Sequence, residues 1–205
     1  MVVRDHYRTI ATRVEARIKV QRSEFIAVTF AVTSDEDFFE ALTAIQRSFF
    51  DATHHCWAFR LFQGGKDRGR SSDAGEPKGT AGKPILKAIE SNDLSDTAIV
   101  VIRYFGGTKL GTGGLARAYR DAATAALAAA AIEDRFVYTR MSIEVPYTAT
   151  SIAYRLIDPP NVCLRKEEFG EMPRLIVDVR TSRVDEFVRA LEARRFRYTI
   201  ESTSS

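Results

Sequence analysis

The sequence is poor in cysteine and has no long hydrophobic run. Its two cysteines, Cys56 and Cys163, lie far apart, unlike the paired cysteines of a secreted protein stapled by disulfides. The longest uncharged apolar stretch, residues 122–132, is about half of the ~20 residues that a membrane-spanning helix needs. The amino terminus lacks the charged and then apolar pattern of a signal peptide. These absences predict a cytoplasmic protein with no membrane partner.

Glycine is scarce outside one segment. Eleven of the twelve glycines lie between Gly64 and Gly114, and only Gly170 lies elsewhere. Glycine loses the most backbone freedom on folding, so a cluster is expected only where the chain turns sharply, takes positive φ or lets another molecule come close. The segment therefore predicts a working surface with exposed backbone amides.

The positive charge of the chain is mild and local. A net charge of +3 over 205 residues is far from that of a protein that coats nucleic acid by charge alone. Residues 60–120 hold 11 basic and 6 acidic residues, a net +5, whereas the rest of the chain holds 19 basic and 21 acidic residues, a net −2. The glycine-rich segment thus favours an anionic partner.

Hydrophobic patterning in the first part of the chain predicts strands and one helix. Alternation over residues 7–32 predicts two or three antiparallel strands, and alternation over residues 53–62 predicts another. Between them, Ser34 followed by Asp37 is typical of a helix start.

The glycine-rich segment is predicted to contain a long polar loop over residues 63–79, because hydrophobic periodicity is missing there. Pro84 belongs in the first turn of the next helix. Residues 98–102 are apolar on both faces and predict a central strand, and residues 115–132 predict a long alanine-rich helix.

A boundary near residue 137 divides the chain into domains 1–136 and 137–205. Beyond it, the pattern predicts strands and helices in the order βαββαβ, which is that of a ferredoxin-like domain. The expected strands cover residues 138–145, 162–169, 173–180 and 196–201, and the expected helices cover residues 148–157 and 183–194. The predicted fold class is therefore α+β with two domains.

Two glycine patterns look like nucleotide-binding loops but fail in detail. Gly106 and Gly111 have the spacing of a phosphate-binding loop, yet Thr112 stands where lysine is required. The stretch 111–116 fits a dinucleotide-binding pattern, but its acidic partner Glu133 precedes a strand instead of closing one.

An anion site at the second glycine loop is still consistent with the sequence. Amides of residues 106–114, at the start of a helix and beside Lys109 and Arg117, are suited to bind an anion. The alternative is that these glycines only turn the chain from a strand into its helix.

His54, His55 and Cys56 invite a metal-site or nucleophile interpretation. Adjacent strand residues point to opposite faces, so the two histidines cannot easily share one ion, and an apolar strand cysteine is more often a packing residue. Asp73 and Glu76 are a candidate acid and base, but ion pairing and turn formation are commoner roles for such residues. We predict no metal, no cofactor and no catalytic residue.

The stretch 194–198 (RRFRY) interleaves arginine with aromatic residues, a composition suited to single-stranded RNA. The alternative is a helix end followed by an edge strand.

Several blocks of the sequence resemble the signature of the YigZ/IMPACT family. They are DATH at 51–54, GEP at 75–77, GTAG at 79–82, PIL at 84–86, RYFGG at 103–107 and KLGTGG at 109–114. The resemblance covers about residues 20–125, and the carboxyl part is similar to the ferredoxin-like domain of bacterial YigZ members.

The resemblance implies a first domain with the left-handed βαβ fold of a small-subunit ribosomal protein and of domain IV of elongation factor G. A domain like domain V of that factor would follow. Eukaryotic members regulate translation by binding the activator of a starvation-sensing kinase, and bacterial members have been suggested to bind nucleic acid or the ribosome. Ala74 departs from a usual acid, which weakens any two-carboxylate metal site, and Lys78 strengthens the preference for an anion.

We expect a non-enzymatic, translation-associated protein that binds RNA or the ribosome through a basic glycine-rich face. One alternative is a protein-interaction regulator of translational stress signalling with Tyr104 and Phe105 as exposed anchors, and another is a phosphate-handling enzyme. The candidate site residues are Arg70, Ser71, Asp73, Glu76, Lys78, Thr80, Lys83, Arg103, Tyr104, Gly106, Gly107, Lys109, Gly111, Gly113, Gly114 and Arg117.

Overall fold

The computed structural model describes residues 4–201 and divides into two compact units. The first domain comprises residues 7–135, and the second comprises residues 136–201 together with residues 4–6. The expected boundary lies one residue beyond this division. Residues 4–6, which we expected in the first domain, group with the second. The reason is that the Asp5 carboxylate accepts hydrogen bonds from the Arg180 guanidinium and the Ser182 N–H, both at 2.8 Å.

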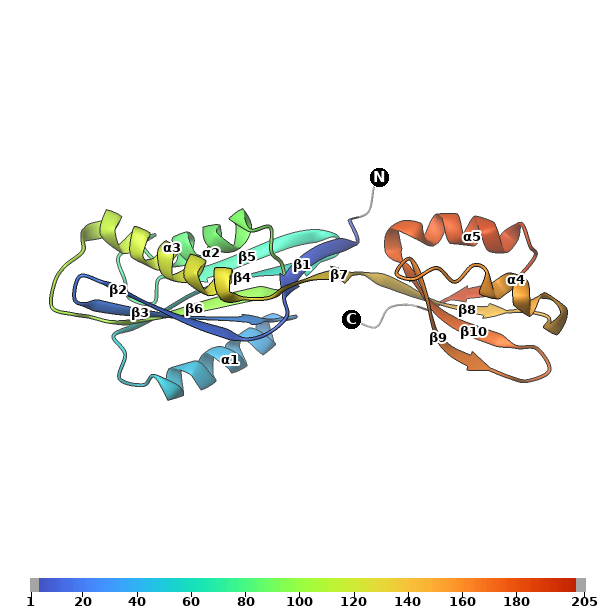
Figure 1. Cartoon of the computed structure of the whole chain (residues 1–205), viewed down its shortest axis with the longest axis horizontal. Coiled ribbons are helices and arrows are strands. Elements are labelled where there is room, and N and C mark those ends of the chain that lie inside the picture. The colour runs from blue at the N-terminus through green and yellow to red at the C-terminus, as the bar shows by residue number, and fades with distance from the viewer. Residues whose placement is uncertain (1–3, 202–205) are drawn as a thin grey trace. The chain divides into compact units, whose positions relative to one another are not determined.

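The first domain is built on a five-stranded antiparallel sheet with β6 at its centre (Figure 1). The strand order is β2-β3-β6-β4-β5, and each neighbouring pair is antiparallel. The strands are β2 (Val14–Val20), β3 (Ser23–Ala31), β4 (His54–Gln63), β5 (Lys66–Ser72) and β6 (Thr97–Tyr104), and the helices are α1 (Asp35–Ser48), α2 (Gly82–Ser91) and α3 (Gly111–Ala129).

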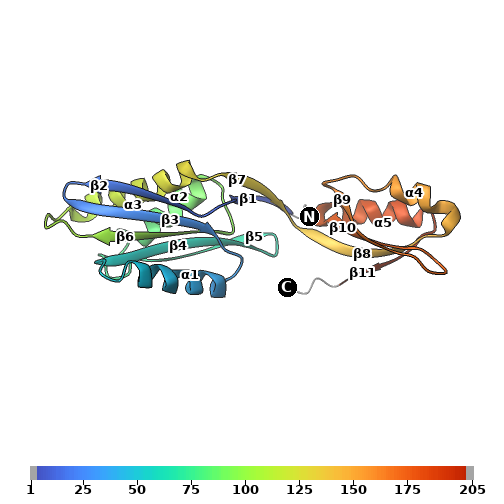
Figure 2. The ribbon, with the colours of Figure 1, turned by 60° about the horizontal axis from the view of Figure 1, so that its bottom comes forward.

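Helices cover both faces of this sheet, with α1 on one side and α2 and α3 on the other (Figures 1 and 2). The Ser34 hydroxyl caps α1 by accepting a hydrogen bond from the Asp37 N–H, as its spacing predicts. Pro84 lies in the first turn of α2, also as predicted. The two helical layers bury the side chains on both faces of β6, which is why this strand is an uninterrupted hydrophobic run.

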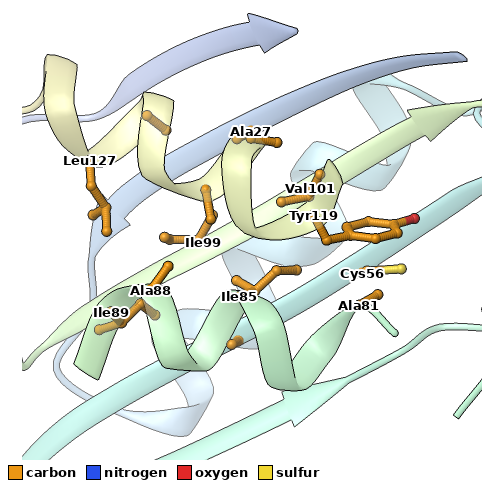
Figure 3. Packing of buried hydrophobic residues seen from close by; sticks show 14 of the residues in the cluster. Ala27, Cys56, Ala81, Ile85, Ala88, Ile89, Ile99, Val101, Tyr119 and Leu127 are labelled. Carbon is orange, nitrogen blue, oxygen red and sulfur yellow. The ribbon is translucent and has the colours of Figure 1, made fainter. Parts of the chain in front are cut away.

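The core under α2 and α3 is made of small and branched side chains (Figure 3). Alanines of α3 let that helix lie close to the sheet, where Ala122, Ala123 and Ala126 are buried. At one end of this cluster the ring of Tyr119 lies beside the thiol of Cys56 (Figure 3). This end of the core therefore carries two polar groups, the Tyr119 hydroxyl and the Cys56 thiol.

The expectation of a loop over residues 63–79 is wrong for residues 66–72, which form β5. This strand pairs with β4 along its whole length but carries polar side chains and a glycine, and it lies at the edge of the sheet. An edge strand with little side-chain burial shows no hydrophobic alternation. The backbone pairing that forms β5 therefore leaves no pattern in the sequence. The predicted start of α3 also moves, from residue 115 to Gly111, because three glycines occupy the first turn.

The second domain has a four-stranded antiparallel sheet in the order β11-β8-β10-β9. The elements follow the predicted βαββαβ sequence, and this strand order is that of a ferredoxin-like sheet. They are β8 (Tyr138–Glu144), the 3₁₀ turn η1 (Tyr147–Ala149), α4 (Thr150–Tyr154), β9 (Val162–Glu168), β10 (Arg174–Arg180), the 3₁₀ turn η2 (Thr181–Arg183), α5 (Val184–Glu192) and β11 (Arg197–Ile200).

Two further strands, β1 (His6–Ile10) and β7 (Ile132–Phe136), pair with each other, and the chain crosses between the two units within them. In the stretch 194–198, Phe196 is buried and Tyr198 is half-buried against the core of the second domain. This arrangement matches a helix end followed by an edge strand, and the same two rings line a hollow with Arg174 and Arg197. No helix in the described part of the chain is both long and apolar enough to cross a membrane.

Candidate functional site

The Asp73 carboxylate holds the loop that precedes α2. Its Oδ1 accepts hydrogen bonds from the N–H groups of Ala81 and Gly82 at 2.9 and 2.8 Å, and its Oδ2 accepts one from the Gly79 N–H at 2.7 Å. Burial alone would raise the pKa of Asp73, but these three bonds outweigh it and hold the pKa below its usual value. The residue at the start of α2, Ala81, has no side chain that can accept a hydrogen bond from the free N–H groups of the helix. The Asp73 carboxylate, which lies eight residues earlier, accepts these bonds instead.

Glu76 and Arg103 form a buried ion pair under this loop. Arg103 Nη1 lies 2.6 Å from Glu76 Oε1, and the two side chains are only 6% and 3% exposed. The same carboxylate oxygen accepts a hydrogen bond from the Tyr119 hydroxyl at 2.8 Å. The guanidinium also lies 5.4 Å from the ring centres of Phe25 and Phe105. Both charges are thus buried and paired with each other inside the domain.

His54 and Cys56 belong to the same cluster. A ring nitrogen of His54, Nδ1, lies 3.0 Å from the Ala74 carbonyl oxygen, and Nε2 lies 3.9 Å from Glu76 Oε1. The Cys56 thiol donates a hydrogen bond to the Asp73 carbonyl oxygen at 2.9 Å, and burial raises its pKa to about 12. Such a thiol is a packing residue and not an activated nucleophile. Within residues 4–201, no group of three His, Cys, Asp or Glu side chains comes together as a metal site requires.

The glycines of the candidate site serve two different purposes. A Cβ on Gly106 would lie 1.9 Å from the backbone of Arg22, so that glycine lets two chain segments touch. By contrast, a Cβ on Gly107, Gly111 or Gly113 would meet no atom within 4 Å. The latter three line an open surface at the start of α3, where Leu110 provides no side-chain cap.

Four other candidates are held by contacts within the domain. Arg70 pairs with Asp35 and lies over the rings of Phe39 and Phe59 on the α1 side of the sheet. The predicted site placed it with the glycine loops because its strand was not recognised. Ser71 is half-buried in β5 opposite Ala58. The remaining two are Thr80, whose hydroxyl bonds to the Pro77 carbonyl oxygen, and Tyr104, whose hydroxyl bonds to Asp51.

Four cations from two helices surround one hollow on the first domain. Its volume is about 280 Å³, and none of the described residues that line it is acidic. Lys83 and Lys87 come from α2, and Arg117 and Arg120 come from α3; we call these four residues the basic α2–α3 surface. The lining is completed by Gly79, Pro84 and Ala116.

Lys87 and Arg120 were missed by the sequence analysis. A signal was present, because Lys87 follows Lys83 by four residues and Arg120 follows Arg117 by three, which places each pair on one helix face. On α3 the exposed stripe continues from Gly113 through Arg117 and Arg120 to Thr124. Lys78 and Lys109 are exposed in the adjoining loops.

The basic α2–α3 surface has spare positive charge. Arg117, Lys87 and the neighbouring Lys109 form no ion pair with any of residues 4–201, and Arg120 pairs only with the exposed Asp121. Lys83 lies near enough to Asp73 to lower the pKa of that carboxyl. The sequence-predicted site therefore divides into an internal frame and an exposed cationic part.

Comparison with known proteins places the first domain in a described family. The Impact N-terminal domain model matches residues 21–127. A Bacillus subtilis relative, IMPACT family member YvyE, is 34% identical over 69% of this chain, and the chain spans 65% of the length of that relative. An IMPACT family member from Haemophilus influenzae is 31% identical over 82% of both chains.

A solved structure shares the fold of the whole chain. It is described as the crystal structure of a hypothetical protein, and it is 24% identical with a TM-score of 0.66 over 98% of this chain and 99% of its own. This likeness supports the two-domain α+β architecture. The family match and the relatives together show that the chain belongs to the IMPACT family.

Proposed function

We propose that this protein binds RNA through the basic α2–α3 surface and acts in translation without catalysing a reaction. The supporting observation is the convergence of Lys83, Lys87, Arg117 and Arg120 on one hollow with no acidic neighbour in its described lining. Cations that converge from two helices create a positive potential that suits a polyanion. The resemblance to the YigZ/IMPACT family supplies the link to translation.

The neighbouring loop extends the same preference. The open backbone of Gly107, Gly111 and Gly113 lies at the start of α3, and Lys109 stands beside it. The amino end of a helix carries partial positive charge and free N–H groups, so it adds to the attraction for phosphates. The internal residues Asp73, Glu76 and Arg103 act by holding these elements in place.

The test is a salt titration of binding between the full chain and purified ribosomal RNA. The logarithm of the affinity should fall linearly with the logarithm of salt concentration, by roughly 0.7 to 0.9 for each phosphate contact. The Lys83→Ala/Arg117→Ala variant should bind more weakly and should lower this slope by about one to two. Alanine is the best helix former, so neither substitution should disturb α2 or α3.

The matched control removes the same two charge types from the other face of the sheet. Lys19 of β2 and Arg47 of α1 are exposed and lie away from α2 and α3. Lys19→Ala/Arg47→Ala should leave the slope unchanged. An absence of RNA binding at low salt, or equal losses in the two double variants, would refute the proposed function.

A second candidate function, binding of a protein partner, is favoured by one observation. Phe50 is 85% exposed and Phe105 is 47% exposed. The two lie near each other, because Tyr104 bonds to Asp51 and the Phe105 N–H donates to the Thr53 hydroxyl. Exposed aromatic residues are typical anchors of protein interfaces. A Phe50→Ser/Phe105→Ser variant that loses a specific, purified partner while keeping RNA affinity would support this function.

A further inference from the structure

The basic α2–α3 surface lacks exposed aromatic side chains. The described lining of its hollow consists of lysine, arginine, glycine, proline and alanine. The one aromatic residue of α3, Tyr119, is fully buried, and α2 contains none. A ligand on this surface therefore meets positive charge and small side chains, but no ring on which a base could stack.

The exposed aromatic residues of the first domain lie on other elements. Phe39 belongs to α1, Phe50 follows that helix, and Phe105 follows β6. Helix α1 covers the opposite face of the sheet from α2 and α3 (Figure 2). None of these three side chains lines the hollow between the four cations.

The residue types on the basic α2–α3 surface favour double-helical RNA over single-stranded RNA. Proteins that bind single strands combine a basic groove with aromatic rings, and each stacked base contributes about 1–3 kcal/mol. A double helix hides its bases, so proteins recognise it by its phosphates and its shape. A surface that offers charge without stacking gains little from exposed bases and much from the dense phosphates of a duplex.

The shape of α3 agrees with close approach of a phosphate backbone. Gly113 begins the exposed stripe that continues through Arg117 and Arg120, and its missing side chain leaves open space beside the main chain. On the facing helix, Lys83 and Lys87 are one turn apart. Two rows of cations from α2 and α3 thus lie on either side of a shallow hollow that a sugar–phosphate backbone can follow.

From these observations we infer that the ligand of the basic α2–α3 surface is double-helical RNA rather than an unpaired strand. The inference rests on the proposed function and specifies its ligand. Contacts to phosphates carry no base information, so binding is independent of base sequence.

The experiment compares three probes with the full chain by fluorescence anisotropy at one low salt concentration. They are a perfect RNA duplex of about 16 base pairs, the span of a compact duplex-binding domain, an oligouridine strand with the same number of phosphates, and a DNA duplex of equal length. The RNA duplex should bind about tenfold or more tightly than oligouridine, because the strand has lower charge density and finds no stacking partner. A change of duplex sequence should leave the affinity unchanged.

Variants assign the effect to the surface. Lys87→Ala/Arg120→Ala should remove most of the difference between RNA duplex and strand, whereas Lys19→Ala/Arg47→Ala should keep it. Oligouridine binding as tight as the RNA duplex, a DNA duplex that binds more tightly than the RNA duplex, or loss of RNA affinity in Phe50→Ser/Phe105→Ser would overturn the inference. Each of these three results would still be compatible with the proposed function. Failure of every probe and of ribosomal RNA to bind would overturn both.

Discussion

The Glu76 carboxylate and the Arg103 guanidinium meet at 2.6 Å inside the first domain, although 27 residues separate them in the sequence. Removing one partner of a buried pair leaves an uncompensated charge and typically costs ~3–5 kcal/mol. We therefore expect Glu76→Ala to lower the free energy of unfolding by about that amount, measured by urea denaturation of the full chain. Tyr119→Phe removes one donor from the same carboxylate and should cost less, about 1.5–3 kcal/mol. A Glu76→Ala protein as stable as the unmodified chain would contradict the prediction.

The stability contributed by Asp73 should depend on pH. The pKa of this carboxyl is lower in the folded protein than in the unfolded chain, where it lies near ~4. The folded state therefore binds fewer protons between the two values, so the contribution is complete above the unfolded pKa. It is lost as pH falls through the folded pKa.

Asp73→Asn should consequently be less stable than the unmodified chain at pH 7, and the difference should shrink between about pH 5 and pH 2. An asparagine has one acceptor oxygen for three N–H donors, so it cannot replace the cap of α2. Urea midpoints measured across this pH range check the prediction. If the difference between the urea midpoints of the two proteins stayed constant across this pH range, Asp73 would make no such contribution.

Alanine substitutions at three glycines should separate the effects of packing, backbone conformation and helix propensity on the stability of the first domain. Gly106→Ala should be strongly destabilising, because its Cβ would overlap the backbone of Arg22. Gly111→Ala meets no atom but requires φ near +68°, which costs about 1–2 kcal/mol. Gly113→Ala lies in the first turn of α3 with free space around it, so it should stabilise by ~0.5–1 kcal/mol. Thermal unfolding of the three variants should give that order.

The two cysteines should differ in reactivity. Cys56 is fully buried, and burial raises its pKa to about 12, whereas Cys163 is only partly buried. Because the thiolate is the reactive form, iodoacetamide at pH 8 should modify Cys163 in the native protein and leave Cys56 untouched. Mass spectrometry of tryptic peptides gives the extent at each site. Modification of both in urea provides the control for intrinsic reactivity.

Elements with a buried face could be predicted from the sequence, and the edge strand could not. The helix start at Ser34, the central position of β6 and the βαββαβ order of the second domain all follow from capping and apolar periodicity. Strand β5 has no such periodicity, because pairing with β4 and not side-chain burial holds it. Without that strand, the direction of Arg70 toward α1 could not be inferred.

The chemistry of the site was harder to predict than its position. Residues 60–120, which carry the local net charge of +5, include all four cations of the basic α2–α3 surface. The sequence could not show that Glu76 and Arg103 neutralise each other in the interior, since that pairing depends on how the loop after β5 meets β6. Lys87 and Arg120 could have been found by projecting charges onto the two predicted helices.

The internal frame and the exposed cations follow different parts of the sequence. The signature blocks supply the three N–H groups that Asp73 binds at the start of α2, the Glu76–Arg103 pair and the close contact at Gly106. Residues 83, 87, 117 and 120 all lie outside those blocks. None of these four side chains takes part in the Asp73 cap, the Glu76–Arg103 pair or the contact at Gly106. The contacts that hold the fold and the charges that attract a ligand therefore reside on separate side chains, and each set can be altered by mutation without touching the other.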